Sequence, residues 1–243
     1  MKKRIRDLSK IDTIILAGGL GNRLKPILKD RPKCMALING VPFIDILINN
    51  CLKQGLRRFI ICVGYLKEQV IDHLGNRNDC EIMFSQENKL LDTGGALKKA
   101  QPLIKSDIYL VFNGDSLINI NIDHYVNWFY KNELNISLVI TRVNNSNRYG
   151  NVIINNNGFI TNFEEKNNHD NAGNISTGVY LIKKSDTYFS DFDNIFSLEK
   201  DVFPYLVKQG TLSAFFCIGK FIDIGTEKSF RNAQLYQLKK NFS

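Results

Sequence analysis

The sequence is short of cysteine, and its five cysteines are not spaced for pairing. Their number is odd and no two form a CxxC pair, so a disulfide framework or a zinc ribbon is disfavoured. Thiols without such a pattern are typical of a reducing compartment, and we expect the protein to be cytoplasmic. The five are Cys34, Cys51, Cys62, Cys80 and Cys217.

Long apolar runs are also missing. None approaches the roughly 20 residues that a helix needs to cross a bilayer. The basic start, residues 1–10, resembles the first part of a signal peptide. The apolar stretch after it is short, however, and leads into glycines without a small-residue cleavage pattern. We therefore expect no membrane partner and no anchor.

Acidic residues are scarce near the N-terminus. Residues 1–33 hold ten lysines and arginines against three aspartates, which accounts for +7 of the net charge of +8. A cationic segment around a glycine-rich loop indicates a small polyanionic ligand, although a solvated tail is the simpler explanation for residues 2–10. The remaining chain is nearly neutral and has no aromatic-basic RNA-binding pattern, so we expect no nucleic-acid partner.

Strand and helix patterns alternate through the first half of the chain. Short apolar runs, most of them ending in Gly or Asp, predict buried strands, and apolar residues at helical spacing predict amphipathic helices. This alternation predicts an α/β fold with a mainly parallel sheet and helices on both faces, and ligands bind such sheets at the carboxyl ends of the strands. Strands are expected at 11–18, 57–64, 80–86 and 107–115, and helices at 41–55, 65–75 and 93–104.

The second half is richer in strand patterns. An Asn-rich turn at 155–158 divides a β-hairpin, and Pro204 disturbs an otherwise helical stretch. No linker or internal repeat is present, so we expect one domain over residues 1–243, with its halves at about 11–115 and 116–243. Strands are expected at 136–143, 148–166 and 176–184, and helices at 197–210 and 226–240.

The strongest local signal is the stretch LAGGLGNRLKPILKDRPK at 16–33. Glycines let the backbone pass close to phosphate groups and direct N–H groups at them. An arginine adds bidentate contacts to phosphate oxygens, and a lysine adds a point charge. The combination indicates a phosphate-binding loop made by Gly18, Gly19, Gly21, Arg23 and Lys33.

Two better-known phosphate loops do not fit this stretch. GxxxxGK[ST] is absent, which excludes the P-loop signature. GLGNRL matches GxGxxG except for Leu24 at the third glycine, so a dinucleotide-binding oxidoreductase is disfavoured. Cys34, which follows Lys33, is expected to be a packed thiol rather than a nucleophile.

AGGLGNRL followed by PK resembles the signature of the sugar-1-phosphate nucleotidyltransferases. That family's later landmarks follow in the same order and cover roughly residues 11–240. The resemblance implies a Rossmann-like α/β fold, a nucleotide half, a sugar-phosphate half and a Mg²⁺-dependent reaction. The landmarks are LDTGGAL (91–97), NGD (113–115), RYG (148–150), FEEK (163–166), STGVY (176–180) and FIDIG (221–225).

The resemblance also implies residue roles. Asp115 and Asp223 match the metal-binding aspartates, and carboxylates with phosphate oxygens suit Mg²⁺. Matches to catalytic residues are Arg23, Lys33 and Lys166. Matches to sugar-phosphate contacts are Asn113, Gly150, Glu165, Lys166, Asn174 and Thr177. Matches to nucleotide contacts are Leu16, Ala17, Gly18, Gly19, Gly21, Gln86, Thr93 and Gly94.

Two details of the pattern stay open. Gln86 stands where relatives read the nucleobase, but Glu87 is equally placed. Asp92 stands where the family has the first glycine of LGTGGA, which leaves the backbone of the base pocket undetermined.

The implied reaction joins a nucleoside triphosphate and a sugar 1-phosphate and releases pyrophosphate. Among family members, the chain most resembles D-glycero-α-D-manno-heptose 1-phosphate guanylyltransferases, and family resemblance also indicates a homodimer. The alternatives are a uridylyl- or thymidylyltransferase acting on a hexose or amino-sugar 1-phosphate, and a non-catalytic homologue that binds nucleotide sugars.

Overall fold

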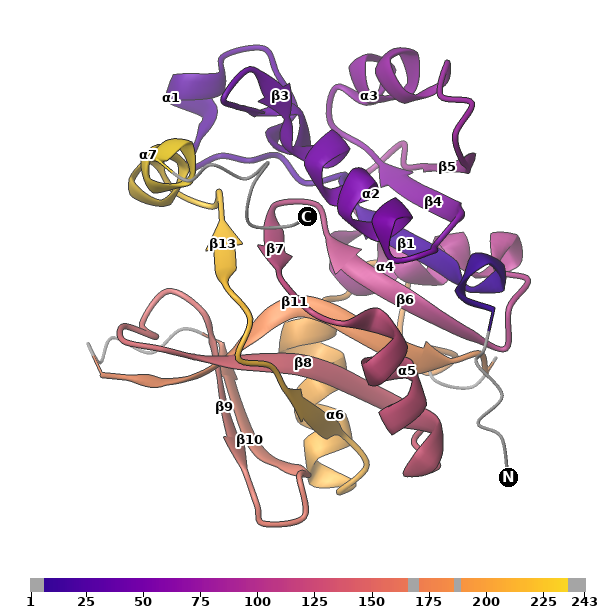
Figure 1. The fold of residues 1–243 in the computed structure, drawn as a ribbon, viewed down its shortest axis with the longest axis vertical. Helices are drawn as coiled ribbons and strands as arrows, with labels where there is room; N and C mark the ends of the chain where they lie inside the picture. The colour runs from indigo at the N-terminus through magenta and orange to yellow at the C-terminus, as the bar shows by residue number, and fades with distance from the viewer. Residues whose placement is uncertain (1–6, 166–170, 186–188, 236–243) are drawn as a thin grey trace.

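A nine-stranded mixed sheet organises the chain in the computed structural model (Figure 1), which describes residues 7–165, 171–185 and 189–235. The predicted first-half strands are present and run parallel. β1 (Asp12–Leu16) lies between β4 (Arg58–Val63) and β6 (Ile108–Asn113), and β5 (Glu81–Gln86) continues the sheet beyond β4. The carboxyl ends of β1, β4 and β6 therefore meet at one edge, as parallel pairing requires.

Helices cover both faces of this sheet, as the alternating pattern predicted. Strand side chains point alternately to the two faces, so Ile15 of β1 belongs to one apolar cluster and Ile14 to the other. The first cluster packs against α2 (Phe43–Lys53), α3 (Lys67–Leu74), α5 (Ile122–Lys131) and α7 (Glu227–Leu235). The second packs against α4 (Asp92–Ala100) and α6 (Phe203–Lys208).

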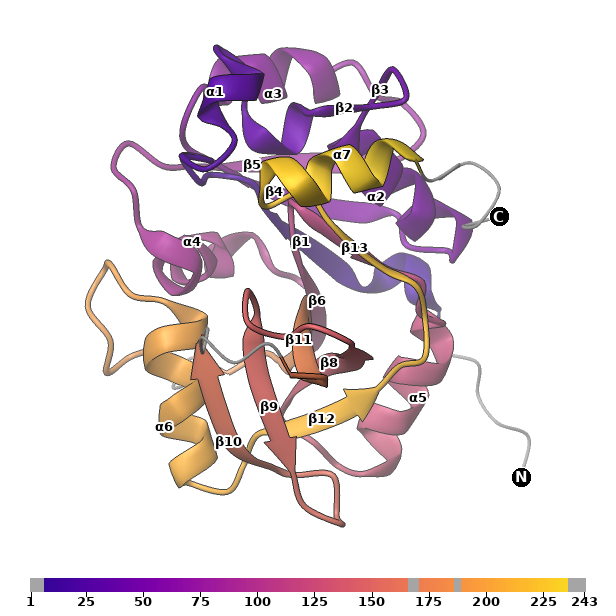
Figure 2. The ribbon, with the colours of Figure 1, turned by 90° about the vertical axis from the view of Figure 1, so that its left-hand side faces the viewer.

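The second half joins the sheet through antiparallel pairs. The long strand β11 (Gly173–Lys183) lies against β6 and also pairs with β8 (Ile136–Val143). β9 (Gly150–Ile154) and β10 (Ile160–Glu165) form the predicted hairpin beside the start of β11. Figure 2 shows this hairpin and α6 at one end of the molecule, with α2, α3 and α7 at the other. β12 (Ser213–Phe216) pairs with β8.

Short elements complete the fold around the sheet edge. β7 (Ser116–Ile118) and β13 (Phe221–Asp223) form an antiparallel pair, which brings two distant parts of the sequence together. α1 (Lys25–Leu28) follows the glycine-rich loop, and β2 (Leu37–Ile38) pairs with β3 (Val41–Pro42). Among the described residues, short 3₁₀ helices occur at Leu8–Lys10, Lys33–Met35 and Gln101–Leu103.

The structure differs from the sequence expectations at three helices. α5, which follows β7 in the chain, was not predicted; its apolar face packs on β8 and β12, where Tyr125 contacts Ser137 and Phe215. The stretch 197–210 is not one disturbed helix: a π-helical turn at Leu198–Val202 precedes α6, and Pro204 lies in the first turn of α6, where no N–H is needed. α7 is described to Leu235, and residues 236–240 of the predicted last helix lie outside the described residues.

None of the helices in the described ranges combines the length and the apolar character that a bilayer crossing needs.

Candidate active site

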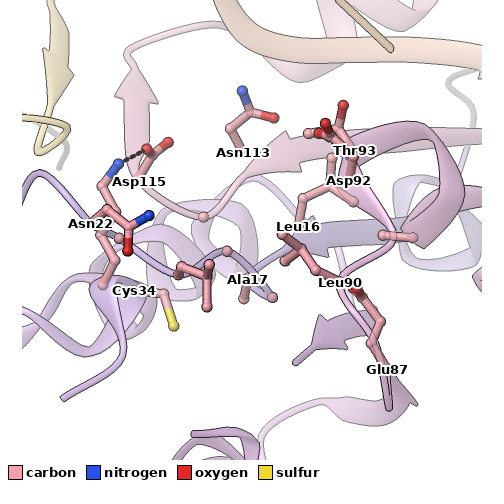
Figure 3. A pocket seen from close by; sticks show the side chains of 17 residues that line it. Leu16, Ala17, Asn22, Cys34, Glu87, Leu90, Asp92, Thr93, Asn113 and Asp115 are labelled. Carbon is pink, nitrogen blue, oxygen red and sulfur yellow. Dashed lines mark hydrogen bonds and ion pairs between the residues drawn. The ribbon is translucent and has the colours of Figure 1, made fainter. Parts of the chain in front are cut away.

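Two adjoining pockets lie at the carboxyl edge of β1 and β6. The first, of about 370 Å³, is lined by the glycine-rich loop after β1 and by the segment before α4. The second, of about 280 Å³, lies between β7, β9, β11 and β13. Four residues line both pockets: Asp92, Thr93, Asn113 and Asp115. In Figure 3, Asn113 lies between Asp115 and Thr93 along this common wall. A ligand in the first pocket would thus border directly on a ligand in the second.

The glycine-rich loop lines the first pocket, and at two of its three glycines other residues lie too close for a side chain to fit easily. A Cβ on Gly18 would lie 2.7 Å from a carboxylate oxygen of Glu87, and one on Gly21, at a φ of +61°, would lie 3.1 Å from the Lys33 side chain. A Cβ on Gly19 would meet no protein atom within 4 Å. Leu16, Ala17 and these three glycines line the first pocket, where the sequence pattern placed the nucleotide.

Lys33 and Asp115 form an ion pair that borders both pockets. Lys33 lies in the first pocket, whereas Arg23, further along the loop, lines the second. A Cβ on Gly225 would lie 3.7 Å from both the Arg23 guanidinium and the Lys33 amine, so the two cations approach each other from the loop side. Of the predicted catalytic cations, Lys33 thus lines the first pocket and Arg23 the second, and both lie near Gly225. The third, Lys166, lies outside the described residues.

Asp223 is held by a network that the motif comparison did not assign. Its Oδ1 accepts a hydrogen bond from the Gly225 N–H at 2.9 Å, and its Oδ2 accepts one from the Tyr149 hydroxyl and one from Arg148 at 3.0 Å. Burial and the neighbouring Asp223 carboxylate raise the pKa of Tyr149, which therefore stays protonated as a donor. Arg148 and Tyr149 directly precede Gly150 in RYG, and that adjacency was the available signal for them.

The two predicted metal ligands lie side by side on the β7–β13 ladder. Asp223 is the register partner of Ser116, and the amide of Ile224 donates to the carbonyl oxygen of Asp115 at 2.9 Å. Both carboxylates line the second pocket. The donor set fits a hard divalent cation, which takes one or two protein carboxylates and completes its shell with substrate phosphates and water. No cluster of three or more His, Cys, Asp or Glu side chains suited to a metal occurs within the described ranges.

The far wall of the second pocket contains an acid that sequence reasoning missed. The Glu199 carboxylate, in the π-helical turn before α6, accepts hydrogen bonds from Thr93 Oγ1 at 2.6 Å and from the Tyr180 hydroxyl at 2.9 Å. Thr93 Oγ1 also accepts the Leu198 amide proton. Thr93 thereby fixes the start of α4 to the wall, and no motif pointed to Glu199 beforehand.

The end of the first pocket that follows β5 distinguishes Glu87 from Gln86. Glu87 is buried and lines the pocket, and its Oε2 accepts the Leu91 amide proton at 3.0 Å. Burial raises the pKa of this carboxyl. Gln86, the residue chosen from the sequence, is exposed at the end of β5 and does not line either pocket. Alternation along the strand turns the two side chains in opposite directions.

Asp92, which stands where the family resemblance implies a glycine, takes a left-handed backbone with φ of +60°. Its carboxylate accepts the Thr93 amide proton at 2.7 Å, a local bond that helps Asp tolerate this conformation. Cys34, as expected, is a packed thiol: it is buried, and burial raises its pKa to about 12.

The remaining sugar-phosphate candidates are distributed unevenly. Asn113, Gly150 and Thr177 line the second pocket, although the Thr177 hydroxyl is engaged by donating to the Val139 carbonyl at 2.9 Å. Glu165 is the register partner of Gly150 in β10. Asn174 lines a separate hollow of about 220 Å³ and is not brought to this pocket.

Gly94 is likewise not a pocket residue. It packs on Phe196, whose ring atoms lie 2.3 Å from where a Cβ would stand, and its amide donates to the Phe196 carbonyl at 2.9 Å. A tight helix start, rather than contact with a ligand, accounts for this glycine.

Known proteins with similar sequences cover almost the whole chain. It is 32% identical over 225 residues to a D-glycero-α-D-manno-heptose 1-phosphate guanylyltransferase of Aneurinibacillus thermoaerophilus, with 92% of this chain and 97% of that protein covered. It is 35% identical over 226 residues to the protein of that name from Campylobacter jejuni, with 90% and 97% covered.

A solved structure agrees with these sequence matches. The crystal structure of HddC from Yersinia pseudotuberculosis complexed with GMP-PN superposes with a TM-score of 0.82 at 31% identity, covering 93% of this chain and 98% of that one. The model of the nucleotidyl transferase family matches residues 12–240, which include both pockets. Members of this family generally use a divalent metal ion. From these matches and the shared pocket edge, we conclude that the chain belongs to the nucleotidyl transferase family.

Proposed function

We propose that the protein is a guanylyltransferase that converts GTP and D-glycero-α-D-manno-heptose 1-phosphate to GDP-heptose and pyrophosphate. The observation that carries this proposal is the junction of the two pockets, where Asp92, Thr93, Asn113 and Asp115 line both. Two substrates bound there would have their phosphates next to each other. The relatives that match along almost their full length carry this activity in their names.

Catalysis in this proposal consists of positioning and charge stabilisation. The acceptor phosphate is ionised near neutral pH, so its oxygen attacks the α-phosphorus without a general base. Arg23 and the loop amides hold the departing pyrophosphate, and Lys33 neutralises charge that grows on the transferred phosphate. Lys166 aligns the acceptor phosphate. Mg²⁺, held by Asp115 and Asp223, would supply further electrostatic stabilisation of the phosphates.

Guanine is favoured over the other bases by Glu87. The guanine edge presents two neighbouring donors, N1–H and N2–H₂, and a carboxylate accepts both. One Glu87 oxygen is held by the Leu91 amide, which fixes the carboxylate at the pocket wall. Uracil and thymine offer one imide N–H between two carbonyls, and those carbonyls would meet the carboxylate unfavourably.

The test is a matrix of pyrophosphate-release assays with Mg²⁺. GTP, UTP, CTP, ATP and dTTP are crossed with heptose, mannose, glucose and N-acetylglucosamine 1-phosphates. We expect the highest kcat/KM with GTP and the heptose 1-phosphate. A maximum with UTP or dTTP and a hexose would replace this function by the alternative transferase. No release with any pair, from protein that still binds a nucleotide, would favour a non-catalytic binder.

We further propose that the metal is Mg²⁺, that the protein is cytoplasmic and that it forms a homodimer. In this proposal the chain is one domain, with a nucleotide half at about 11–115 and a sugar-phosphate half at about 116–243. Light scattering after size-exclusion chromatography separates a dimer from a monomer, and restoration of EDTA-treated enzyme by Mg²⁺ against Ca²⁺ or Zn²⁺ tests the metal.

A further inference from the structure

Each of the two carboxylates proposed for the metal carries a protein cation of its own. Asp115 pairs with Lys33, and Asp223 pairs with Arg148. Arg148 lies in the turn before β9 and reaches across the second pocket to β13, where one terminal nitrogen donates to Asp223 Oδ2 at 3.0 Å and the other to Thr226 Oγ1 at 2.6 Å. Lys33 already has a place in the proposed chemistry, whereas Arg148 has none.

Asp223 does not need Arg148 for its orientation. The Gly225 amide holds one carboxylate oxygen and the Tyr149 hydroxyl holds the other, so the side chain is fixed from two sides without the guanidinium. The Arg148 side chain is 35% exposed and Asp223 is 14% exposed. Arg148 is therefore the more solvated partner, and because the orientation of Asp223 does not depend on it, what Arg148 adds at Asp223 is mainly positive charge.

A divalent cation and a guanidinium compete for the same oxygen. Asp223 and Arg148 both line the second pocket, so a cation bound at Oδ2 would meet the guanidinium there, and like charges at contact distance repel each other. Thr226 Oγ1 holds another Arg148 nitrogen at the pocket wall, so a guanidinium that leaves Oδ2 would stay anchored in the second pocket. Its bonds to described residues use three of the five N–H donors, which leaves two for an incoming anion.

We propose that Arg148 is the resident counter-ion of Asp223, that a divalent cation displaces it from Oδ2, and that the freed guanidinium then binds the acceptor's phosphomonoester. The planar fork suits two phosphate oxygens at once. The metal ion thereby replaces the guanidinium at the Asp223 carboxylate, and the same movement makes the guanidinium available to bind phosphate. The phosphate part rests on the proposed function, whereas the displacement does not.

The displacement is tested by calorimetric titration of Mn²⁺ alone into the nucleotide-free protein. Arg148→Met should bind Mn²⁺ at least about threefold more tightly than the wild type, because a competing charge is gone. Arg142→Met is the matched control: it removes the same charge from an exposed position of β8 that lines neither pocket, and its affinity should stay at the wild-type value. Equal or weaker Mn²⁺ binding by Arg148→Met would overturn the displacement.

The phosphate contact is tested by titrating inorganic phosphate into the Mn²⁺-saturated protein. Arg148→Met should weaken phosphate binding at least about fivefold, and Arg148→Lys, which keeps the charge but loses the fork, should lie between it and the wild type. Phosphate affinity equal to that of the wild type in both variants would overturn this part. Thermal melts establish that each variant is folded. Neither titration needs turnover, so failure of the proposed substrate pair and failure of this inference are separate results.

Discussion

Replacement of Glu87 by glutamine tests how the protein selects its base. Glu87 is buried at 6% exposure with one oxygen fixed by the Leu91 amide. Glutamine keeps that bond through its carbonyl oxygen but turns an NH₂ group toward the base, so a donor faces the two guanine donors. The variant therefore changes one acceptor into one donor and leaves the volume of the pocket almost unaltered.

The magnitude follows from the loss of a charge-assisted hydrogen bond. Such a bond contributes about 1.5–3 kcal/mol, which corresponds to roughly a tenfold to hundredfold loss in kcat/KM for GTP. The loss should be smaller for ATP, whose edge lacks the N1–H donor. Selectivity for GTP over ATP should accordingly narrow, while the KM for the sugar 1-phosphate changes by less than about twofold because the second pocket is intact.

The assay is continuous pyrophosphate release with each nucleotide at saturating sugar 1-phosphate. Gln86→Ala is the control, because Gln86 is exposed on the adjacent position and lines neither pocket. Its kcat/KM for GTP should stay within about twofold of the wild type. If Gln86→Ala loses GTP selectivity and Glu87→Gln keeps it, then Gln86, the residue that the sequence pattern favoured, contacts the base, and the proposed role of Glu87 is wrong.

Four further outcomes follow from the site. Lys33→Ala or Asp115→Ala should lower kcat by about 10² or more and raise the KM for the sugar far less, because both act on developing charge; turnover equal to the wild type contradicts those roles. Gly178→Ala should lower the free energy of unfolding by about 2 kcal/mol in denaturant titrations, since φ is +78° and a Cβ would lie 2.7 Å from the Asn113 amide, whereas Gly19→Ala should leave stability nearly unchanged. Burial raises the pKa of Glu87, so its protonation sets in at a higher pH than for an exposed glutamate and the KM for GTP should rise as the pH is lowered; this rise, after allowance for substrate ionisation, should vanish in Glu87→Gln. EDTA should abolish pyrophosphate release and Mg²⁺ should restore it, whereas release that persists in EDTA would contradict a metal-dependent reaction.

Local patterns were sufficient for the parallel half of the fold. Three of the four strands are apolar runs that end in glycine or aspartate, β5 is a shorter apolar run, and each predicted helix carries an apolar face at helical spacing, so these elements could be located without knowing their neighbours. The glycine-rich loop could also be located from the sequence, since Gly18 and Gly21 are positions where neighbouring residues lie close to the loop backbone. α5 was missed, although its apolar residues follow helical spacing once its position on the sheet is known.

Motif spacing assigned the predicted aspartates to one site, but it did not show how they meet. Asp115 and Asp223 are adjacent because β7 and β13 pair, a contact between segments more than 100 residues apart. Likewise, the sequence left Gln86 and Glu87 as alternatives because they are neighbours. The turn of β5 at the pocket edge makes one buried and the other exposed.

The sequence by itself determined the order of the parallel strands and their connecting helices, the glycine-rich loop and the kinds of side chain available for phosphate and metal. These are local properties, set by the conformational freedom of glycine, by apolar periodicity and by the chemistry of single residues. Tertiary structure alone decided which polar groups share a pocket: Arg148 and Tyr149 with Asp223, and Glu199 with Thr93. Such partnerships depend on the distances between strand ends after folding, and no local pattern in the chain encodes those distances.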